Sequence, residues 1–111
     1  MIDGNTMKHF ILFYDFVPDY VTRRTPYRPA HFAHAQAAVA RGELVLGGAC
    51  TDDPAPLGVL VFAAADRAIV EDFAREDPYV VEGVATGWRV REWTTVVGRD
   101  ALSKPATPPS A

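Results

Sequence analysis

A histidine early in a helix-like segment and an aspartate in an Asp-Pro turn are the residues of this sequence best suited to chemistry. His31 lies in the stretch RPAHFAHAQ at 28–36, and Asp77 opens the stretch DPYVVEGV at 77–84. A carboxylate that accepts a hydrogen bond from one imidazole nitrogen fixes the tautomer and leaves the other nitrogen free to take a proton. We therefore expect His31 to be a general base oriented by Asp77, an arrangement that supplies roughly 10²–10⁴-fold in rate.

Both residues also have a structural interpretation, which the sequence leaves open. A lone helix histidine is commonly a residue at the rim of the core, hydrogen-bonded to backbone. An aspartate before a proline commonly caps or braces the turn in which it lies.

Three further residues are candidates for contacts with a substrate. Arg28 lies three residues before His31, on the same side of the expected helix, and either binds an anionic group or pairs with a surface carboxylate. Tyr14 and Tyr79 are candidates for lining a pocket, with a place in the core as the alternative for each, because aromatic residues of small proteins are usually core.

Metal and cysteine chemistry have weaker support in the sequence. His31 and His34 form an H-x-x-H pair, but a third ligand is missing from their neighbourhood, so we expect no metal there, and His34 to be a solvated helix residue. The reaction expected of His31 and Asp77 requires no cofactor. Cys50 lacks a local signature that would activate it as a nucleophile, and a small residue at a strand end is the simpler interpretation. Gly47-Gly48 lacks the lysine and helix start of a phosphate-binding loop.

The composition indicates one globular domain of ordinary type. The chain has 111 residues, of which 49% are hydrophobic and 23% charged, enough for a modest core. A net charge of −3 argues against nucleic-acid binding, and no apolar run approaches the ~20 residues of a membrane helix. The polar, acidic N-terminus does not resemble a signal peptide, and a single cysteine fits a reducing compartment, so we expect a cytoplasmic protein.

Hydrophobic periodicity predicts the order β-α-β-β-α-β between a flexible leader and a disordered proline-rich tail. The first helix is expected to bury a stripe formed by Phe32, Ala35 and Val39. The predicted segments are the leader at 1–6, strands at 7–16, 43–49, 57–64 and 84–97, helices at 28–41 and 67–75, a loop at 17–26, and the tail at 98–111.

This element order predicts an α+β, ferredoxin-like fold. Right-handed crossovers place both helices on one face of a four-stranded antiparallel sheet. The strands at 7–16 and 57–64 are apolar on both faces, however, and an uncovered second face would be larger than the apolar patches that monomers usually expose. We therefore expect a homodimer, a dimeric α/β barrel in which two sheets pack face to face.

The motifs of this chain resemble those of the YciI-like (YCII-related) family. The resemblance rests on RPAHFAHAQ at 28–36, RGELVLGGA at 41–49 and DPYVVEGV at 77–84, and it covers about residues 7–97. It implies a dimeric ferredoxin-like protein whose active site is a His–Asp pair, which corresponds to His31 and Asp77.

The resemblance also has implications for the reaction. A relative is implicated in removing HCl from a chlorinated hydroxyhydroquinone, which implies proton abstraction of the lyase type. The family often has Gly-Pro after its second strand, where this chain has Gly48-Ala49-Cys50, so one wall of the pocket differs.

Two functions follow as hypotheses. The first is a small-molecule enzyme that uses the His–Asp pair for proton abstraction, with elimination or isomerisation of a small oxygenated, possibly aromatic, substrate. The alternative is a non-catalytic dimeric protein that binds a small ligand or serves as an accessory domain. A hydrogen bond between His31 and Asp77 beside an open pocket favours the enzyme.

Overall fold

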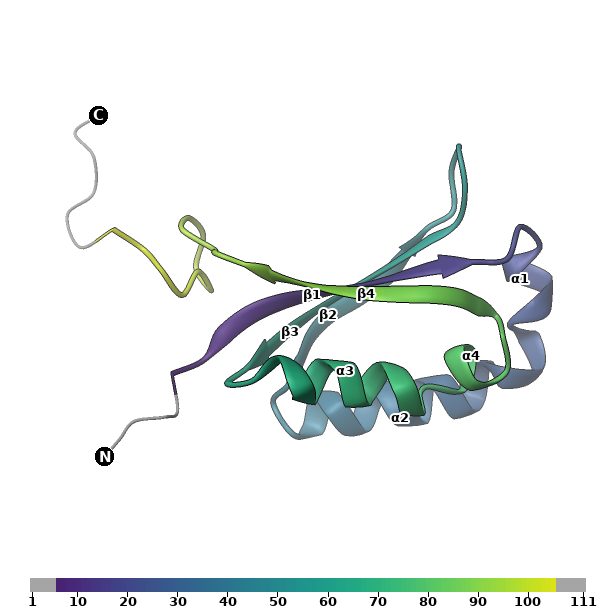
Figure 1. Cartoon of the computed structure of the whole chain (residues 1–111), viewed down its shortest axis with the longest axis horizontal. Helices are drawn as coiled ribbons and strands as arrows, with labels where there is room; N and C mark the ends of the chain where they lie inside the picture. The colour runs from purple at the N-terminus through teal and green to yellow at the C-terminus, as the bar shows by residue number, and fades with distance from the viewer. Residues whose placement is uncertain (1–5, 106–111) are drawn as a thin grey trace.

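A four-stranded antiparallel sheet with all its helices on one face forms the protein (Figure 1). The computed structural model describes residues 6–105. The strands lie in the order β2-β3-β1-β4, which confirms the predicted ferredoxin-like βαββαβ topology. The strands are β1 (Lys8–Phe16), β2 (Leu44–Cys50), β3 (Leu57–Ala64) and β4 (Ala85–Trp93), and the helices are α1 (Tyr20–Arg23), α2 (Arg28–Ala40), α3 (Arg67–Glu76) and α4 (Pro78–Val81), with a 3-10 turn η1 (Thr25–Tyr27).

The core lies between the sheet and the helices. Alternate residues of the central strand β1 point to the helices and are buried, while β1 pairs with β3 on one side and β4 on the other. Leu12, for example, lies opposite Leu60 and Val90, and all three are buried. Alternation with a period of two thus places one apolar set of each central strand in the core.

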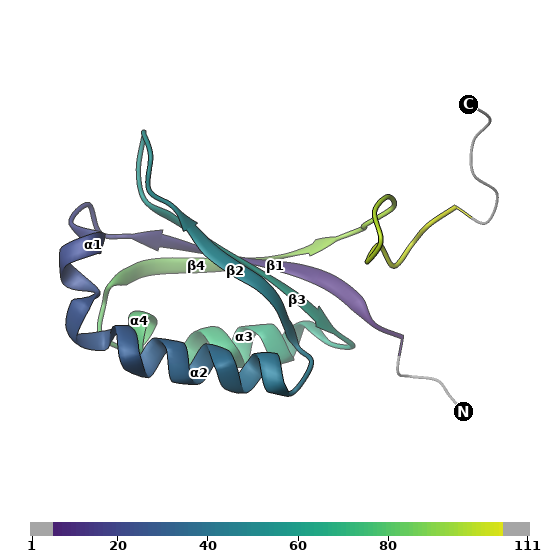
Figure 2. The same ribbon diagram turned by 180° about the vertical axis from the view of Figure 1, so that it is seen from behind.

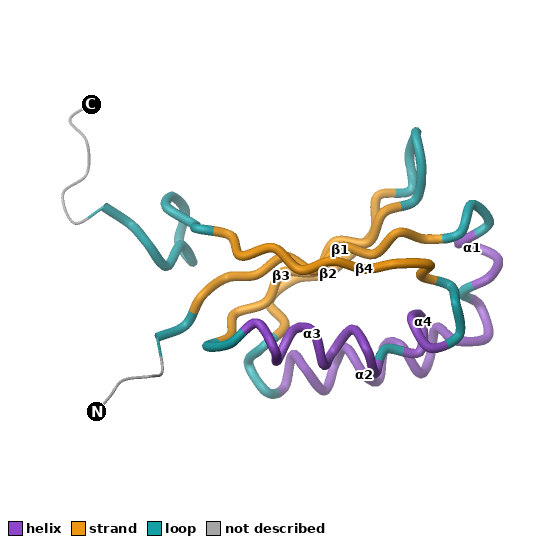
Figure 3. The backbone as a smooth tube through the Cα atoms, viewed as in Figure 1, coloured by secondary structure: helices purple, strands orange, loops and turns teal. Residues whose placement is uncertain are grey.

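The other face of the sheet is uncovered in the single chain (Figures 2 and 3). Its central residues are apolar and half-buried, and Leu46 on the edge strand β2 is 72% exposed. The central positions are Ile11, Phe13, Val59 and Val61.

The ends of the two long helices coincide with capping and breaking residues in the sequence. Gly42, with φ of 78°, follows the end of α2, and a residue with this backbone conformation is most often glycine. The side chain of Asp66 accepts a hydrogen bond from the Ala68 N–H and caps α3. Asp77 takes an extended conformation at the end of α3 and caps the short helix α4, because its side chain accepts from the Tyr79 N–H.

The predicted apolar stripe of α2 is wrong for Phe32 and Val39, although Ala35 packs against the core. Phe32 and Val39 are 48% and 47% exposed, whereas Ala38 is fully buried. The inner side of the helix is instead the i, i+3, i+4, i+7 set of His31, His34, Ala35 and Ala38. Small and planar side chains let α2 pack closely here, and the larger apolar residues border a cavity.

Two boundaries also differ from the predictions. Segment 17–26 contains α1 and most of η1 in place of a loop, since Tyr20 is buried and its ring stacks on Phe16 at 4.0 Å between centroids, which anchors α1 to the core. Strand β4 ends at Trp93, because its partner there is His9, almost at the start of β1. Beyond it the Thr95 hydroxyl accepts from the Leu102 N–H and turns the chain back.

Parts of the predicted leader and tail, residues 1–5 and 106–111, lie outside the described residues. Among residues 6–105, no helix combines the length and hydropathy needed to span a membrane.

Candidate active site

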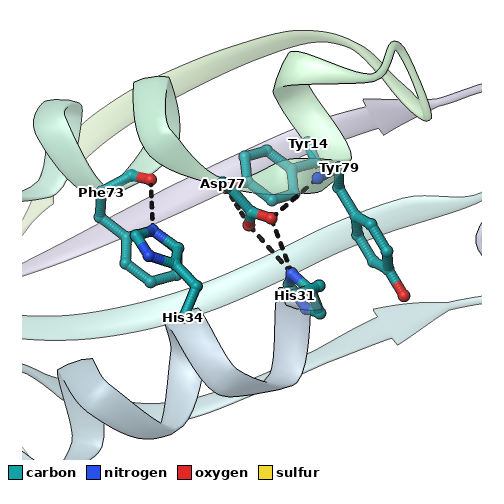
Figure 4. Close-up of polar contacts among 6 residues, drawn as sticks. All are labelled: Tyr14, His31, His34, Phe73, Asp77 and Tyr79. Carbon is teal, nitrogen blue, oxygen red and sulfur yellow. Dashed lines mark hydrogen bonds and ion pairs between the residues drawn. The ribbon is translucent and has the colours of Figure 1, made fainter. Parts of the chain in front are cut away.

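His31 and Asp77, 46 positions apart in sequence, meet between α2 and the turn that joins α3 to α4 (Figure 4). The Nδ1 of His31 lies 2.8 Å from Oδ1 and 3.0 Å from Oδ2 of Asp77. Because a carboxylate only accepts hydrogen bonds, Nδ1 carries the proton and donates it. In the neutral ring Nε2 is then the basic nitrogen, as a general base requires.

Asp77 is held in place by two further donors. The Tyr14 hydroxyl donates to Oδ2 at 2.7 Å, and the Tyr79 backbone N–H donates to Oδ1 at 3.0 Å. The Asp77 side chain is fully buried, so these bonds replace the water that its carboxylate loses. The carboxylate therefore has one fixed orientation, which it imposes on the imidazole.

Local sequence explains why Asp77 can hold this position. Proline at 78 disfavours the helical conformation of the preceding residue, and Asp77 accordingly has φ of −67° and ψ of 125°. The break ends α3, and Pro78 takes a first-turn position in α4 where a missing N–H costs nothing. One carboxylate thereby caps α4 and orients His31.

The ring of Tyr79 supports the imidazole from one side. The His31 and Tyr79 rings are stacked, with centroids 3.9 Å apart and planes 6° from parallel. His31 keeps 13% of its side-chain surface exposed, so it is held on its inner side and still reaches solvent.

The tyrosines of the site hold their protons strongly. Burial, and then the adjacent Asp77 carboxylate, raise the pKa of the Tyr14 hydroxyl far above its usual value. Burial and neighbouring Tyr20 raise the pKa of Tyr79 to about 12, against the opposing effect of Arg24 and Arg28. Tyr14 therefore remains a hydrogen-bond donor to Asp77 over the physiological pH range.

An open cavity of about 480 Å³ lies beside His31. Its walls come from α1, from α2 along most of its length and from the edge strand β2, with aromatic side chains at several positions. Gly58 helps to shape it, because a Cβ there would lie 2.9 Å from the ring of Phe16, which lines the cavity. The aromatic and basic side chains that line it next to His31 include Tyr20, Arg24, Arg28, Phe32 and Tyr79.

The candidate substrate residues have different positions. Arg28 and Tyr79 line the cavity, and the Arg28 guanidinium lies over the Phe32 ring at 4.9 Å. Tyr14 also borders the cavity, but its side chain is fully buried and its hydroxyl is bonded to Asp77.

Some contacts differ from the sequence-based expectations or were missed by them. His34 is half-buried rather than solvated: its Nε2 donates to the Phe73 carbonyl at 2.9 Å, and the two rings stack at 4.3 Å. The signal was present, since His34 lies one turn after His31 on the same side of α2. Arg24 lines the cavity as well, but lies in a segment expected to be a loop.

The cavity lining does not include Cys50, the other residue considered for chemistry. Cys50 is exposed at the end of β2. Among residues 6–105, no three His, Cys, Asp or Glu side chains gather in a way that would hold a metal ion.

Comparisons with known proteins agree with this fold. The chain is similar to a solved structure of 5-chloro-2-hydroxyhydroquinone dehydrochlorinase from Burkholderia phenoliruptrix AC1100 in complex with 2,5-dihydroxybenzoquinone, with 22% identity, a TM-score of 0.66, and coverage of 84% of this chain and 98% of that one. It is also similar to the protein Rv0793 from Mycobacterium tuberculosis, with 14% identity, a TM-score of 0.52, and coverage of 85% and 99%. No curated protein matched the sequence.

The family model gives the assignment. The model of the YCII-related domain matches residues 7–94, which include the four strands, both long helices and the His31–Asp77 pair. The chain therefore belongs to the YCII-related family.

Proposed function

We propose that the protein is a small-molecule enzyme in which Nε2 of His31 removes a proton from a substrate bound in the adjacent cavity. One observation carries the proposal: His31 donates through Nδ1 to a fully buried carboxylate while it borders an open cavity of about 480 Å³. A structural histidine at the core rim needs neither the buried acceptor nor the cavity.

Asp77 and Tyr79 have complementary roles in this mechanism. As Nε2 takes the proton the imidazole becomes positively charged, and the Asp77 carboxylate at 2.8 Å stabilises that charge. The stacked face of Tyr79 stabilises it further as a cation–π contact. The proton then passes from Nε2 to the departing group, to another substrate atom or to solvent.

The substrate is, in this proposal, a small oxygenated ring compound. The aromatic side chains of the cavity suit a flat ring, and a hydroxyl group of such a compound offers an acidic O–H proton to the base. The structurally similar enzyme of Burkholderia is named for removing HCl from a chlorinated hydroxyhydroquinone. We propose a reaction of the same class here, proton abstraction with elimination or isomerisation, and a lyase activity without a cofactor.

We further propose a cytoplasmic homodimer formed through the uncovered sheet face. The apolar residues at the centre of this face are half-buried in the single chain, and burial against a second sheet would remove them from water. The helical layer and the cavity lie on the opposite face (Figure 1).

Turnover by matched histidine variants tests the enzyme proposal. Chlorinated and hydroxylated aromatic compounds are screened for chloride release and for changes in ring absorbance. His31→Gln should lose at least about a hundredfold in kcat and keep its circular dichroism spectrum. His34→Gln is the control, because His34 lies on the same helix but does not line the cavity.

Equal turnover by the wild type and His31→Gln would overturn the catalytic role. Binding of ring compounds without turnover by the wild type would favour the alternative, a non-catalytic small-ligand-binding protein, for which the cavity is also suited. Thermal shift detects such binding because ligand binding raises the free energy of unfolding by an amount set by concentration and Kd.

A further inference from the structure

The cavity beside His31 carries charge of one sign. Arg24 and Arg28 line it together with the neutral imidazole of His31, and no aspartate or glutamate is among its lining residues. Within residues 6–105, neither of the two guanidinium groups forms an ion pair with a carboxylate. This contrasts with the chain as a whole, which has a net charge of −3.

Both guanidinium groups are oriented without being neutralised. Arg24 donates to the Tyr20 hydroxyl at 3.0 Å and lies over the Tyr20 ring at 4.8 Å. Arg28 lies over the Phe32 ring at 4.9 Å. Aromatic faces and a hydroxyl fix the planes of these groups but leave their positive charge uncompensated.

The guanidinium groups of Arg24 and Arg28 line the same cavity as His31 and Tyr79. Tyr79 stacks on His31 at 3.9 Å, and its hydroxyl points away from the Asp77 end of the ring (Figure 4). Arg24 and Arg28 each favour the ionised form of this hydroxyl, which shows that both guanidinium groups act on the same region. The two guanidinium groups and the imidazole therefore face one cavity.

We infer that Arg24 and Arg28 form an anion site, and that the substrate is a single-ring compound that carries a carboxylate. The carboxylate binds the two guanidinium groups, whose planar forks match its two oxygens. The ring then lies along the aromatic wall with its reacting position at Nε2 of His31, a part of the inference that rests on the proposed function. An anion also relieves the repulsion between two like charges that face one cavity.

Equilibrium binding of a matched pair of ring compounds tests this inference. The probes are 2,5-dihydroxybenzoate and 2,5-dihydroxybenzamide, which differ in charge but little in shape, and titration calorimetry measures their Kd. We expect the acid to bind about tenfold more tightly or better, as for hydrogen bonds to charged groups. Arg24→Gln and Arg28→Gln should each weaken binding of the acid by about tenfold and leave that of the amide unchanged.

Arg23→Gln is the matched control, because Arg23 is exposed, adjoins Arg24 and does not line the cavity. It should leave both affinities unchanged. Arg28→Lys keeps the charge and loses the planar fork, so its affinity for the acid should lie between those of the wild type and Arg28→Gln.

Three results would overturn the inference: equal affinity of the wild type for acid and amide, a loss of affinity for the acid in Arg23→Gln equal to that in Arg24→Gln and Arg28→Gln, or no binding of either probe at millimolar concentration.

His31→Gln separates this inference from the catalytic proposal. It should bind the acid as tightly as the wild type within a few-fold, so the anion site can stand even where turnover by the wild type is absent.

Discussion

The imidazole of His31 lies parallel to the phenol ring of Tyr79, with 3.9 Å between centroids and 6° between planes. In the proposed reaction this contact gains strength when the imidazole becomes cationic, because the face of an aromatic ring attracts positive charge. Tyr79→Phe should therefore retain kcat within a few-fold, whereas Tyr79→Leu should lower it by about tenfold. Steady-state kinetics on both variants, with thermal unfolding as the check on folding, makes the comparison. An equal kcat in the two variants would contradict the role of the stacked ring.

Asp77→Asn should impair both stability and turnover. Asparagine keeps the shape of the aspartate side chain, but its NH₂ group then faces one of the groups that now donate a hydrogen bond to Asp77. These groups are His31 Nδ1, the Tyr14 hydroxyl and the Tyr79 N–H. We expect a loss of about 3 kcal/mol in the free energy of unfolding, and a fall of roughly 10³–10⁴ in kcat because the imidazole loses its tautomer and orientation.

The control for this change is Asp72→Asn. Asp72 is exposed and pairs with Arg75 at 3.1 Å on the surface of α3, so its loss should change the free energy of unfolding by less than about 0.5 kcal/mol. Denaturant unfolding measures both variants, and an Asp77→Asn protein as stable as Asp72→Asn would refute the structural part of this prediction.

Stability should fall steeply at alkaline pH. The folded pKa values of Tyr14 and Tyr79 are raised above the ordinary value of 10.0, that of Tyr79 to about 12. Above pH 10 the unfolded chain releases protons that the folded chain retains, so stability that is fully present below pH 10 is lost as the pH rises. The buried Tyr14 contributes a slope of about 1.4 kcal/mol per pH unit, and Tyr79, whose hydroxyl lies at the open cavity, adds a smaller slope that ends near pH 12.

Tyr14→Phe separates the contribution of one hydroxyl. At pH 8 this variant should be about 2 kcal/mol less stable than the wild type, because Asp77 loses a charge-assisted hydrogen bond. Between pH 10 and 12 its stability should fall less steeply, and the difference from the wild type should narrow. Urea unfolding at a series of pH values tests this, and parallel curves would rule it out.

Val61→Glu should dissociate the proposed dimer. Val61 lies on the uncovered sheet face, opposite Ile11 on β1 and Leu46 on β2, so a carboxylate there has only apolar cross-strand neighbours. Burial of an unpaired charge in an interface should weaken association by at least about a hundredfold. Size-exclusion chromatography with light scattering measures the mass.

Val81→Glu is the matched control for the interface, because Val81 is 63% exposed on α4 in the helical layer. It should remain dimeric. A wild-type chain that elutes as a monomer at micromolar concentration would exclude the dimer altogether.

Much of the fold follows from local signals in the sequence. The short-range features are the period-two alternation in β1 and β3, the glycine at 42 that ends α2 and the Asp77-Pro78 break that ends α3. The order of the elements then leaves few possible topologies. The packing side of α2 could not be predicted in this way. Hydropathy favours Phe32 and Val39 as buried residues, whereas the helix in fact packs through alanines and histidines and leaves those two at the cavity.

The site was predictable only in part for a similar reason. The turn chemistry of Asp77 indicates a fixed carboxylate, and the resemblance to the family indicates its partner. The hydrogen bond from Tyr14, 63 positions away, depends on which face of β1 lies under the α3–α4 turn, and no local pattern reports that. Arg24 reaches the cavity because Tyr20 anchors α1, a tertiary effect on a segment with the composition of a loop.

His31 and Asp77 come from different halves of the β-α-β-β-α-β order: α2 belongs to the first β-α-β unit, and the α3–α4 turn to the second. The two units are alike in topology but supply unlike parts, a base from one and its acceptor from the other, so the pseudo-symmetry of the fold does not duplicate the pair. In a dimer closed through the opposite sheet face, each subunit would present its own base to the outside. Substrate could then enter both subunits independently, without their coming apart.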